Sequence, residues 1–228
     1  MDDVKDSGTA GTQRRYHSPL RDENARETRA RIIDAAAELF LERGFARVSV
    51  DEIARASGVA RPTVLTVFGT KANLLRAVVD VAMAGNDGPV PVAQQPWFRP
   101  VWDATTGADC LTAYAKVCVL IGRRSADVIE LVRRASDEGD DIAAQWESLQ
   151  ANRRFGAGTI AQRVHDLGDL RAGLTVRRAT DLVRVWNDTH HYRTLVTESG
   201  WSERAFQHWL AEQMRSSLLD EATDSRRQ

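Results

Sequence analysis

Hydrophobic residues recur at helical spacing through most of this 228-residue chain, and no stretch alternates as a half-buried strand does. The first apolar stripe predicts a helix from about Asp22 to Arg43, ended by Gly44 at a position suited to a C-terminal cap. Its buried positions are Ile32, Ala36, Leu39 and Phe40. Another stripe predicts a helix from Lys71 to about Ala84, with Leu74, Leu75, Val78 and Val79 facing inward. The pattern therefore predicts an all-α protein.

Residues 49–68, between these two helices, predict two short helices joined by a tight turn. Ser49 is suited to cap the first helix, with Glu52 three residues later as its capping-box partner. Gly58 falls in the turn, where a positive φ requires no Cβ, and Pro62 falls near the start of the second helix. Apolar contacts between the two helices come from Ile53, Val59 and Val64. The arrangement is typical of a helix-turn-helix, whose second helix lies in the DNA major groove.

Charge supports DNA binding only locally. The chain has 31 Lys and Arg against 32 Asp and Glu, so its bulk charge attracts no polyanion. From Ile53 to Val79, however, there is no acidic residue, while four positions are basic: Arg55, Arg61, Lys71 and Arg76. Thr70 is suited to cap the next helix, where Lys71 lies beside N–H groups that attract phosphate. We predict DNA contacts from Ser49, Ser57, Arg61, Pro62, Thr63, Thr66 and Lys71, with Lys71 as a phosphate anchor. The alternative is a structural helical hairpin with a solvated basic face.

The composition divides the rest of the chain. Residues 85–100 hold two glycines and four of the six prolines, which predicts a loop or domain seam. All six tryptophans lie at position 97 or later. We expect helices from about 107, interrupted near 122–124 and 137–141, and a last helix capped by Ser202. The predicted organisation is a disordered tail at 1–20, a helix-turn-helix domain at 21–70, a connecting helix at 71–84, a loop at 85–100, a helical domain at 101–219 and a tail at 220–228. Arg14 and Arg15 in the first tail are either a minor-groove arm or part of an untethered segment.

No motif predicts catalysis. A nucleophile elbow, a glycine-rich phosphate loop and an HExxH pattern are all missing from the sequence. His190 and His191 are adjacent, so on a helix they point about 100° apart and cannot both bind one metal ion. Cys110 and Cys118 are separated by about 12 Å along a helix, beyond disulfide reach, and we interpret them as buried apolar residues rather than a redox sensor. We expect no enzyme activity, no cofactor and no metal.

With no membrane-span or signal pattern, we also expect a cytoplasmic protein with no membrane partner.

The second domain is suited to binding a small molecule, because pockets in helical bundles are apolar with a few polar groups. The candidate pocket residues, each of which is otherwise plain core, are Trp102, Tyr114, Cys118, Trp146, Trp186, Asn187 and His190. The last helix is apolar on one face and needs a partner surface. The candidate dimer contacts are Trp186, Leu195, Phe206, Trp209, Leu210 and Met214.

The chain resembles the TetR-type transcriptional regulators. The matching residues are Ile53-Ala54, Gly58-Val59, Thr63, Phe68, Lys71 and Leu74-Leu75, preceded by Ile32, Ala36 and Phe40. The resemblance implies a DNA-binding domain followed by a helical ligand-binding and dimerisation domain, with the last helices paired as a four-helix dimer bundle. Many members have a tyrosine in the second helix and an aromatic residue or histidine two positions on, near the DNA backbone. This chain has Leu65 and Val67 there, which predicts an unusual operator preference.

We therefore expect a homodimeric repressor that a small-molecule effector releases from a pseudo-palindromic, double-stranded operator. Two alternatives stay open. One is a helical small-molecule carrier or enzyme with a degenerate DNA-binding domain, to which Leu65 and Val67 lend slight support. The other is a constitutive regulator with no effector.

Overall fold

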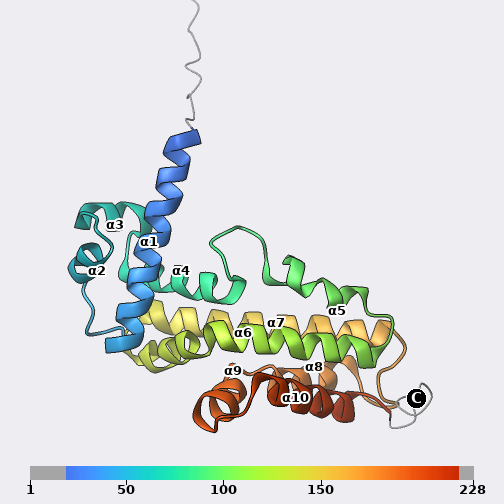
Figure 1. Cartoon of the computed structure of the whole chain (residues 1–228). Helices are drawn as coiled ribbons and strands as arrows, with labels where there is room; N and C mark the ends of the chain where they lie inside the picture. Colours follow the sequence, from blue (N-terminus) through green and yellow to red (C-terminus); the bar gives the residue numbers. More distant parts are fainter. Residues whose placement is uncertain (1–18, 221–228) are drawn as a thin grey trace, which may run out of the picture.

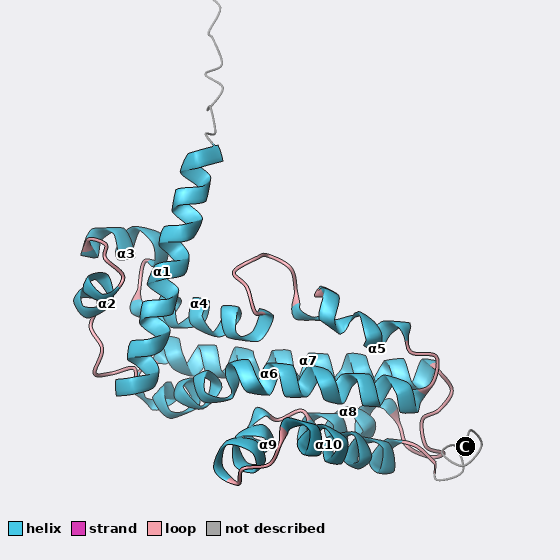
Figure 2. Ribbon diagram, viewed as in Figure 1, coloured by secondary structure: helices cyan, strands magenta, loops and turns pink. Residues whose placement is uncertain are grey.

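The computed structural model describes residues 19–220, in which helices are connected by short turns and no strand is present (Figures 1 and 2). Of the predicted tails at 1–20 and 220–228, only residues 19, 20 and 220 lie within this range. Arg14 and Arg15 lie outside it. The α-helices are α1 (Pro19–Arg43), α2 (Val50–Ala56), α3 (Arg61–Phe68), α4 (Lys71–Ala84), α5 (Arg99–Asp103), α6 (Gly107–Ala135), α7 (Asp140–Asp166), α8 (Val176–Trp186), α9 (Thr189–Tyr192) and α10 (Glu203–Leu218). Single 3₁₀ turns cover Val92–Gln94, Pro96–Phe98 and Ser136–Glu138, and a π-helical segment covers Arg193–Glu198. The prediction of an all-α fold with a helix-turn-helix head and a helical bundle is confirmed.

The helix-turn-helix forms as its capping residues predict. The Ser49 hydroxyl accepts a hydrogen bond from the Glu52 N–H, and the Glu52 carboxylate accepts one from the Ser49 N–H. Gly58 turns the chain with φ of 68°. Thr70 caps α4 by accepting a hydrogen bond from the Asn73 N–H, and Ser202 caps α10 in the same way. These local bonds satisfy N–H groups that a helix leaves unpaired at its start.

The core of the head extends into the bundle. Phe40, Ile53, Val64 and Leu74 are buried together, as expected for a three-helix head closed by α4. The same cluster also contains Val128 and Val132 of α6 and Ile142 of α7, which form one contiguous core with the head residues. The head is therefore not a free-standing globule, because its hydrophobic core is completed by the bundle.

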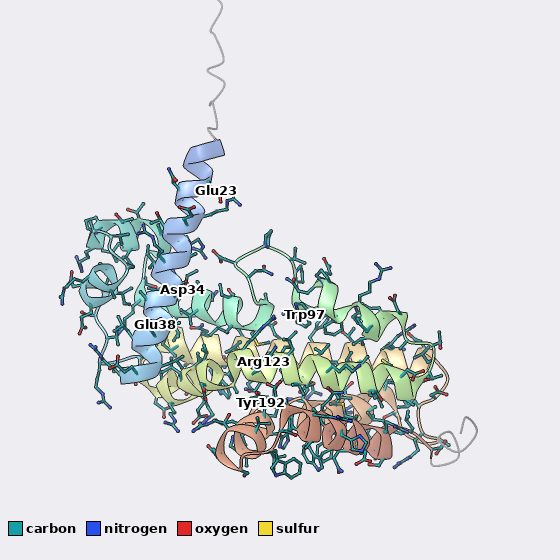
Figure 3. The ribbon with its side chains drawn as sticks, in the orientation of Figure 1. Glu23, Asp34, Glu38, Trp97, Arg123 and Tyr192 are labelled. Carbon is teal, nitrogen blue, oxygen red and sulfur yellow. The ribbon has the colours of Figure 1, made fainter. Side chains whose placement is uncertain are left out.

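The bundle is formed by α6 and α7, which lie side by side, with α8 and α10 packed along them (Figure 1). The predicted break near Gly122 is wrong, since α6 continues from Gly107 to Ala135. Gly122 instead allows close packing, because the Tyr192 ring lies against it. Figure 3 labels Tyr192 below Arg123, the residue that follows Gly122 in α6. The Tyr192 hydroxyl donates to Glu203 of α10 at 2.7 Å. The predicted loop at 85–100 contains two 3₁₀ turns and the first residues of α5. Proline is tolerated in the first turn of a helix, so these prolines begin turns as well as interrupt them.

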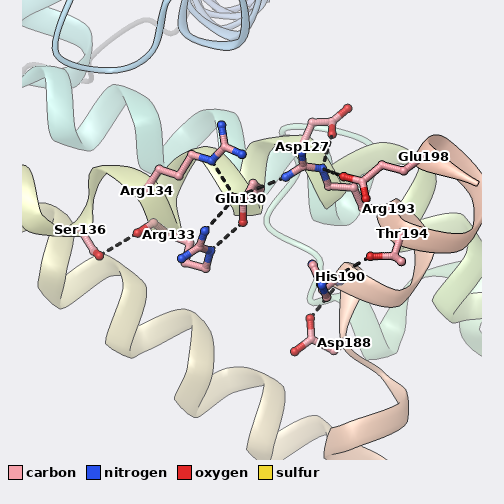
Figure 4. A network of polar contacts seen from close by, with 10 residues as sticks. All are labelled: Asp127, Glu130, Arg133, Arg134, Ser136, Asp188, His190, Arg193, Thr194 and Glu198. Atoms are coloured by element: carbon pink, nitrogen blue, oxygen red, sulfur yellow. Dashed lines mark hydrogen bonds and ion pairs between the residues drawn. The ribbon is translucent and has the colours of Figure 1, made fainter.

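An ionic network fixes the π-helical segment to α6 (Figure 4). The Glu130 carboxylate accepts hydrogen bonds from Arg133 and Arg134 and pairs with Arg193 at 3.3 Å. The hydrogen bond from Arg133 is the main cause that holds the pKa of Glu130 at about 2. Because Arg193 directly follows Tyr192, this network anchors the segment that packs against Gly122.

The close contact at Gly122 predicts the effect of adding one methyl group. A Cβ at this position lies 2.6 Å from Cγ of Tyr192, so Gly122→Ala must displace the ring. We expect a loss of about 1–3 kcal/mol in the free energy of unfolding, measured by urea denaturation. Gly156→Ala on α7 is the control, since no heavy atom lies within 4 Å of its added Cβ. We expect that variant to be neutral or stabilised by up to about 1 kcal/mol. Equal stability of the two variants would contradict the role of Gly122.

Candidate DNA-binding head and ligand cavity

The second helix of the head, α3, buries one side and presents the other to solvent. Val64 and Phe68 are buried, whereas Pro62 and Thr66 are exposed and Thr63 is half-buried. Arg61 is the first residue of α3, and its Nε lies 3.3 Å from the Asp51 carboxylate. Both of those side chains are more than half exposed, so this ion pair is weak and Arg61 can leave it for another anion. Ser49, which caps α2, is also exposed on the head.

Ser57 does not lie where the sequence predicted. Its side chain is buried, and its hydroxyl donates to the Ile53 carbonyl at 2.7 Å, with the Ala54 carbonyl at 3.2 Å. A hydroxyl occupied in this way cannot also donate to a base or a phosphate. Ser57 therefore closes the end of α2 and shapes the turn in this conformation, and its DNA contact stays a prediction that requires the hydroxyl to leave these carbonyls.

Lys71 is likewise a structural residue. Its ammonium donates to the carbonyls of Phe45 and Val48 at 2.9 and 3.0 Å and lies 4.1 Å from the centre of the Phe45 ring. Burial lowers the pKa of Lys71, and the Glu138 carboxylate opposes this shift. The predicted phosphate anchor is thus directed inward, where it holds the loop between α1 and α2 against α4. The sequence showed a cation at a helix N-terminus but not the carbonyls that surround it.

Other cations remain available on the head. Arg55 on α2 and Arg47 in the loop before α2 are exposed, and neither forms an ion pair with any residue in 19–220. Sequence reasoning did not select Arg47, which precedes the acid-free stretch. Both guanidinium groups are free to neutralise phosphate, whereas two of the three N–H donors of Lys71 already bond to carbonyls within the head.

A cavity of about 430 Å³ lies within the bundle, between α4, the segment around α5, and helices α6 to α10. Six of the seven predicted pocket residues line it: Trp102, Tyr114, Cys118, Trp146, Trp186 and Asn187. His190 does not, because its side chain is exposed and its Nε2 faces Thr194 Oγ1 at 3.4 Å. The sequence analysis missed Asp80 and Met83 of α4 and Arg153 of α7, which also line the wall. The helical pattern predicts whether each of these residues lies on the surface or in the core, but it does not show that they share a cavity.

A short polar chain crosses the largely apolar wall. The Asn187 amide donates to the Tyr114 hydroxyl at 3.0 Å, and Tyr114 in turn interacts with the Cys118 thiol. Burial raises the pKa of Tyr114 and raises that of Cys118 to about 12, so both are protonated at neutral pH. The Asn187 carbonyl oxygen is buried and has no hydrogen-bond partner in the described chain. Arg153 pairs with Asp188 at 2.5 Å, and burial raises the pKa of Asp80. The cavity can therefore orient an apolar molecule by a few fixed polar groups.

The predicted dimer residues fall into two groups. Phe206, Leu210 and Met214 are buried inside the protomer, because α10 lies against α6, and they are not available to a second chain. The half-buried ones are Trp186, Leu195 and Trp209. Trp201 and Val185, which were not predicted, are among the exposed large hydrophobic residues of α8 and the segment before α10. The apolar surface left on this side is thus the outer edge of α8 and α10.

Two further features are absent from residues 19–220: a cluster of side chains that could hold a metal ion, and a helix that could cross a membrane. Within 19–220 no three His, Cys, Asp or Glu side chains come together in an arrangement that could hold a metal ion. None of the helices in that range is both long enough and apolar enough to cross a membrane.

Comparison with known proteins identifies the head. Residues 32–78 match the family of bacterial regulatory proteins named the tetR family. A 58-residue segment is 45% identical to the HTH-type transcriptional regulator TtgR of Pseudomonas putida, covering 25% of this chain and 28% of TtgR. A 40-residue segment is 52% identical to the putative mycofactocin biosynthesis transcriptional regulator MftR of Mycobacterium tuberculosis, covering 18% of this chain and 20% of MftR. The match to the tetR family thus covers residues 32–78, and the alignments span little more than a quarter of the length of these relatives.

Solved structures share the fold over most of the chain. NalD, the secondary repressor of the MexAB-OprM multidrug efflux pump in Pseudomonas aeruginosa, superposes with a TM-score of 0.66 at 20% identity, covering 87% of this chain and 98% of NalD. A complex of SmeT with triclosan has a TM-score of 0.66 at 18% identity, covering 85% of this chain and 92% of SmeT. At these identities the likeness establishes the fold, which this chain shares with NalD and SmeT over both the head and the bundle.

The position of Lys71 predicts a stability defect rather than a loss of phosphate contact. Lys71→Met keeps the length of the side chain but leaves two backbone carbonyls without their donor. We expect a loss of about 1–3 kcal/mol in the free energy of unfolding. Arg55→Met, on the exposed side of α2, should stay within about 0.5 kcal/mol of wild type. An unchanged unfolding curve for Lys71→Met, together with a salt dependence of DNA binding reduced by about one phosphate contact, would restore the anchor role.

Proposed function

We propose that this protein is a DNA-binding transcriptional regulator, and specifically a homodimeric repressor, rather than an enzyme. The observation that carries the proposal is the helix-turn-helix head itself, whose α3 presents Arg61, Pro62 and Thr66 outward in a domain of the tetR family. Two such heads in a dimer would occupy successive major grooves of a pseudo-palindromic operator. A protein with this function acts in the cytoplasm.

The cavity supports release of the operator by a small-molecule effector. Asp80 and Met83 belong to α4, whose other side packs in the core of the head through Leu74 and Leu75. A molecule that fits the cavity better when α4 is shifted would favour a head arrangement that does not match the operator. Its effect is limited by its difference in affinity for the two arrangements. SmeT, a structure of the same fold, holds triclosan, which supports an apolar ligand here.

Dimerisation through the outer edge of α8 and α10 is supported by the apolar side chains left exposed there. Val185 and Trp201 are among the large hydrophobic residues exposed on the protomer, and Trp209 packs against Trp201 with ring centres 6.2 Å apart. Covering this edge by a second copy would bury it. The dimer would then place its two heads at a fixed separation.

The decisive experiment is selection of bound duplexes from a random DNA library at moderate salt. We expect enrichment of a two-fold symmetric motif. Arg61→Ala should weaken binding to the enriched duplex by about tenfold or more, because an Arg–base contact contributes on the order of 1–3 kcal/mol. Its sedimentation and thermal unfolding should match wild type. If no sequence is enriched even at low salt, the regulator proposal fails; if Arg61→Ala binds normally, Arg61 is not in the interface.

The effector proposal is tested with a panel of apolar compounds. Binding should raise the melting temperature and quench tryptophan fluorescence, since Trp102, Trp146 and Trp186 line the cavity, and active compounds should release the selected duplex. Asn187→Leu keeps a similar volume but removes the unpartnered carbonyl, so we expect about tenfold weaker binding of a hydrogen-bonding effector. Its affinity for DNA should not change. Compounds that stabilise the protein without releasing the duplex would leave a constitutive regulator as the correct description.

A further inference from the structure

The outward face of α3 is poor in groups that can hydrogen-bond to bases. Pro62 and Thr66 are one helical turn apart, both exposed, on the side opposite the buried Val64 and Phe68. Proline has no N–H, and the Thr66 hydroxyl donates to the Pro62 carbonyl at 2.8 Å. With the hydroxyl directed back along its own helix, the methyl group of Thr66 is the part that remains to meet a ligand. Val67, which follows Thr66 and points about 100° from it around the helix, borders this face and is one of the exposed large hydrophobic residues, at 37%.

Polar side chains near this face are already occupied. Ser57 and Lys71 donate to backbone carbonyls within the head, as described above. That leaves the half-buried Thr63 and the exposed Arg61, of which only Arg61 has the forked geometry that binds guanine through two hydrogen bonds. Direct reading of the operator by hydrogen bonds is thus confined to the N-terminal end of α3.

We propose that the rest of α3 reads thymine through its 5-methyl group, by apolar contact with Pro62, the methyl group of Thr66 and Val67. The proposal rests on the DNA-binding function proposed above. In the major groove the thymine methyl group is the apolar feature that distinguishes one base pair from the others. A helix face made of a proline ring, a threonine methyl and a valine excludes water from that methyl group without needing a donor or an acceptor. Half-sites should therefore combine a guanine opposite Arg61 with one or more thymines opposite the middle of α3.

The test uses the duplex obtained by selection and replaces its thymines one at a time with deoxyuridine, which lacks only the methyl group. Uracil pairs as thymine does, so the hydrogen-bonding pattern of the groove is unchanged. We expect a loss of about fourfold in affinity for at least one thymine in each half-site, which corresponds to about 0.8 kcal/mol for one buried methyl group. Thymines outside the contacted steps should tolerate the change.

Protein variants test the same contact from the other side. Thr66→Ser removes one methyl group and keeps the hydroxyl that bonds to Pro62, and Val67→Ala removes two methyl groups from an exposed position. In at least one of these variants a sensitive thymine should lose its response to uracil, as a double-mutant cycle measures. Val90→Ala is the matched control, because Val90 is 42% exposed but lies in the loop after α4, and its response to uracil should equal that of wild type.

The possible outcomes distinguish failure of this proposal from failure of the proposed DNA-binding function. If no duplex is enriched, the proposed function fails and this inference fails with it. If an operator is bound but uracil changes its affinity less than twofold at every thymine, the regulator stands and methyl reading is wrong. Full uracil sensitivity in both Thr66→Ser and Val67→Ala would also overturn it, because the proposal requires at least one of these two side chains to contact a thymine methyl group.

Discussion

The hydrophobic core that the head shares with the bundle is the constraint on which the rest of the structure depends. Leu74 and Leu75 of α4 are buried in the same cluster as Val128 and Val132 of α6. A domain of about fifty residues buries too little surface to be strongly stable alone, so this contact completes the head. The same contact links the position of α3 to the positions of α4 and α6. Stability of the head and communication with the cavity thus arise from one set of apolar contacts.

Lys71 shows how such a constraint redirects a side chain. A lysine at the start of a helix is suited to bind phosphate, and in an isolated helix it would be solvated. Here the loop between α1 and α2 brings the carbonyls of Phe45 and Val48 within 3.0 Å of its ammonium. Those carbonyls would otherwise lack a hydrogen-bond donor, so the Lys71 ammonium stabilises the head by pointing inward. Exposed cations such as Arg47 and Arg55 then remain free to bind an anion such as phosphate.

The aromatic residues of the bundle fall into two groups, one at the cavity and one at the outer edge of α8 and α10. Trp102, Trp146 and Trp186 reach the cavity, whereas Trp201 and Trp209 lie at the outer edge near α10. Trp186 belongs to both sets, because its ring also packs edge-on against Trp209 at 6.1 Å. A ligand that moves Trp186 would therefore alter the surface offered to a second copy.

By itself, the sequence determined the features that depend on neighbouring residues: the helical class, the Ser49–Glu52 capping box, the turn at Gly58 and the start of α4 at Thr70. It also identified the stretch that matches the tetR family, since that stretch is defined by local spacing. Only the tertiary structure determined what Gly122, Ser57 and Lys71 contact. It also determined that three residues of α10 are buried within one protomer: Phe206, Leu210 and Met214. Each of these outcomes depends on groups far away in the chain, such as Tyr192 against Gly122. Periodicity shows that a side is apolar, but which surface covers it is settled only when helices from distant parts of the chain pack together.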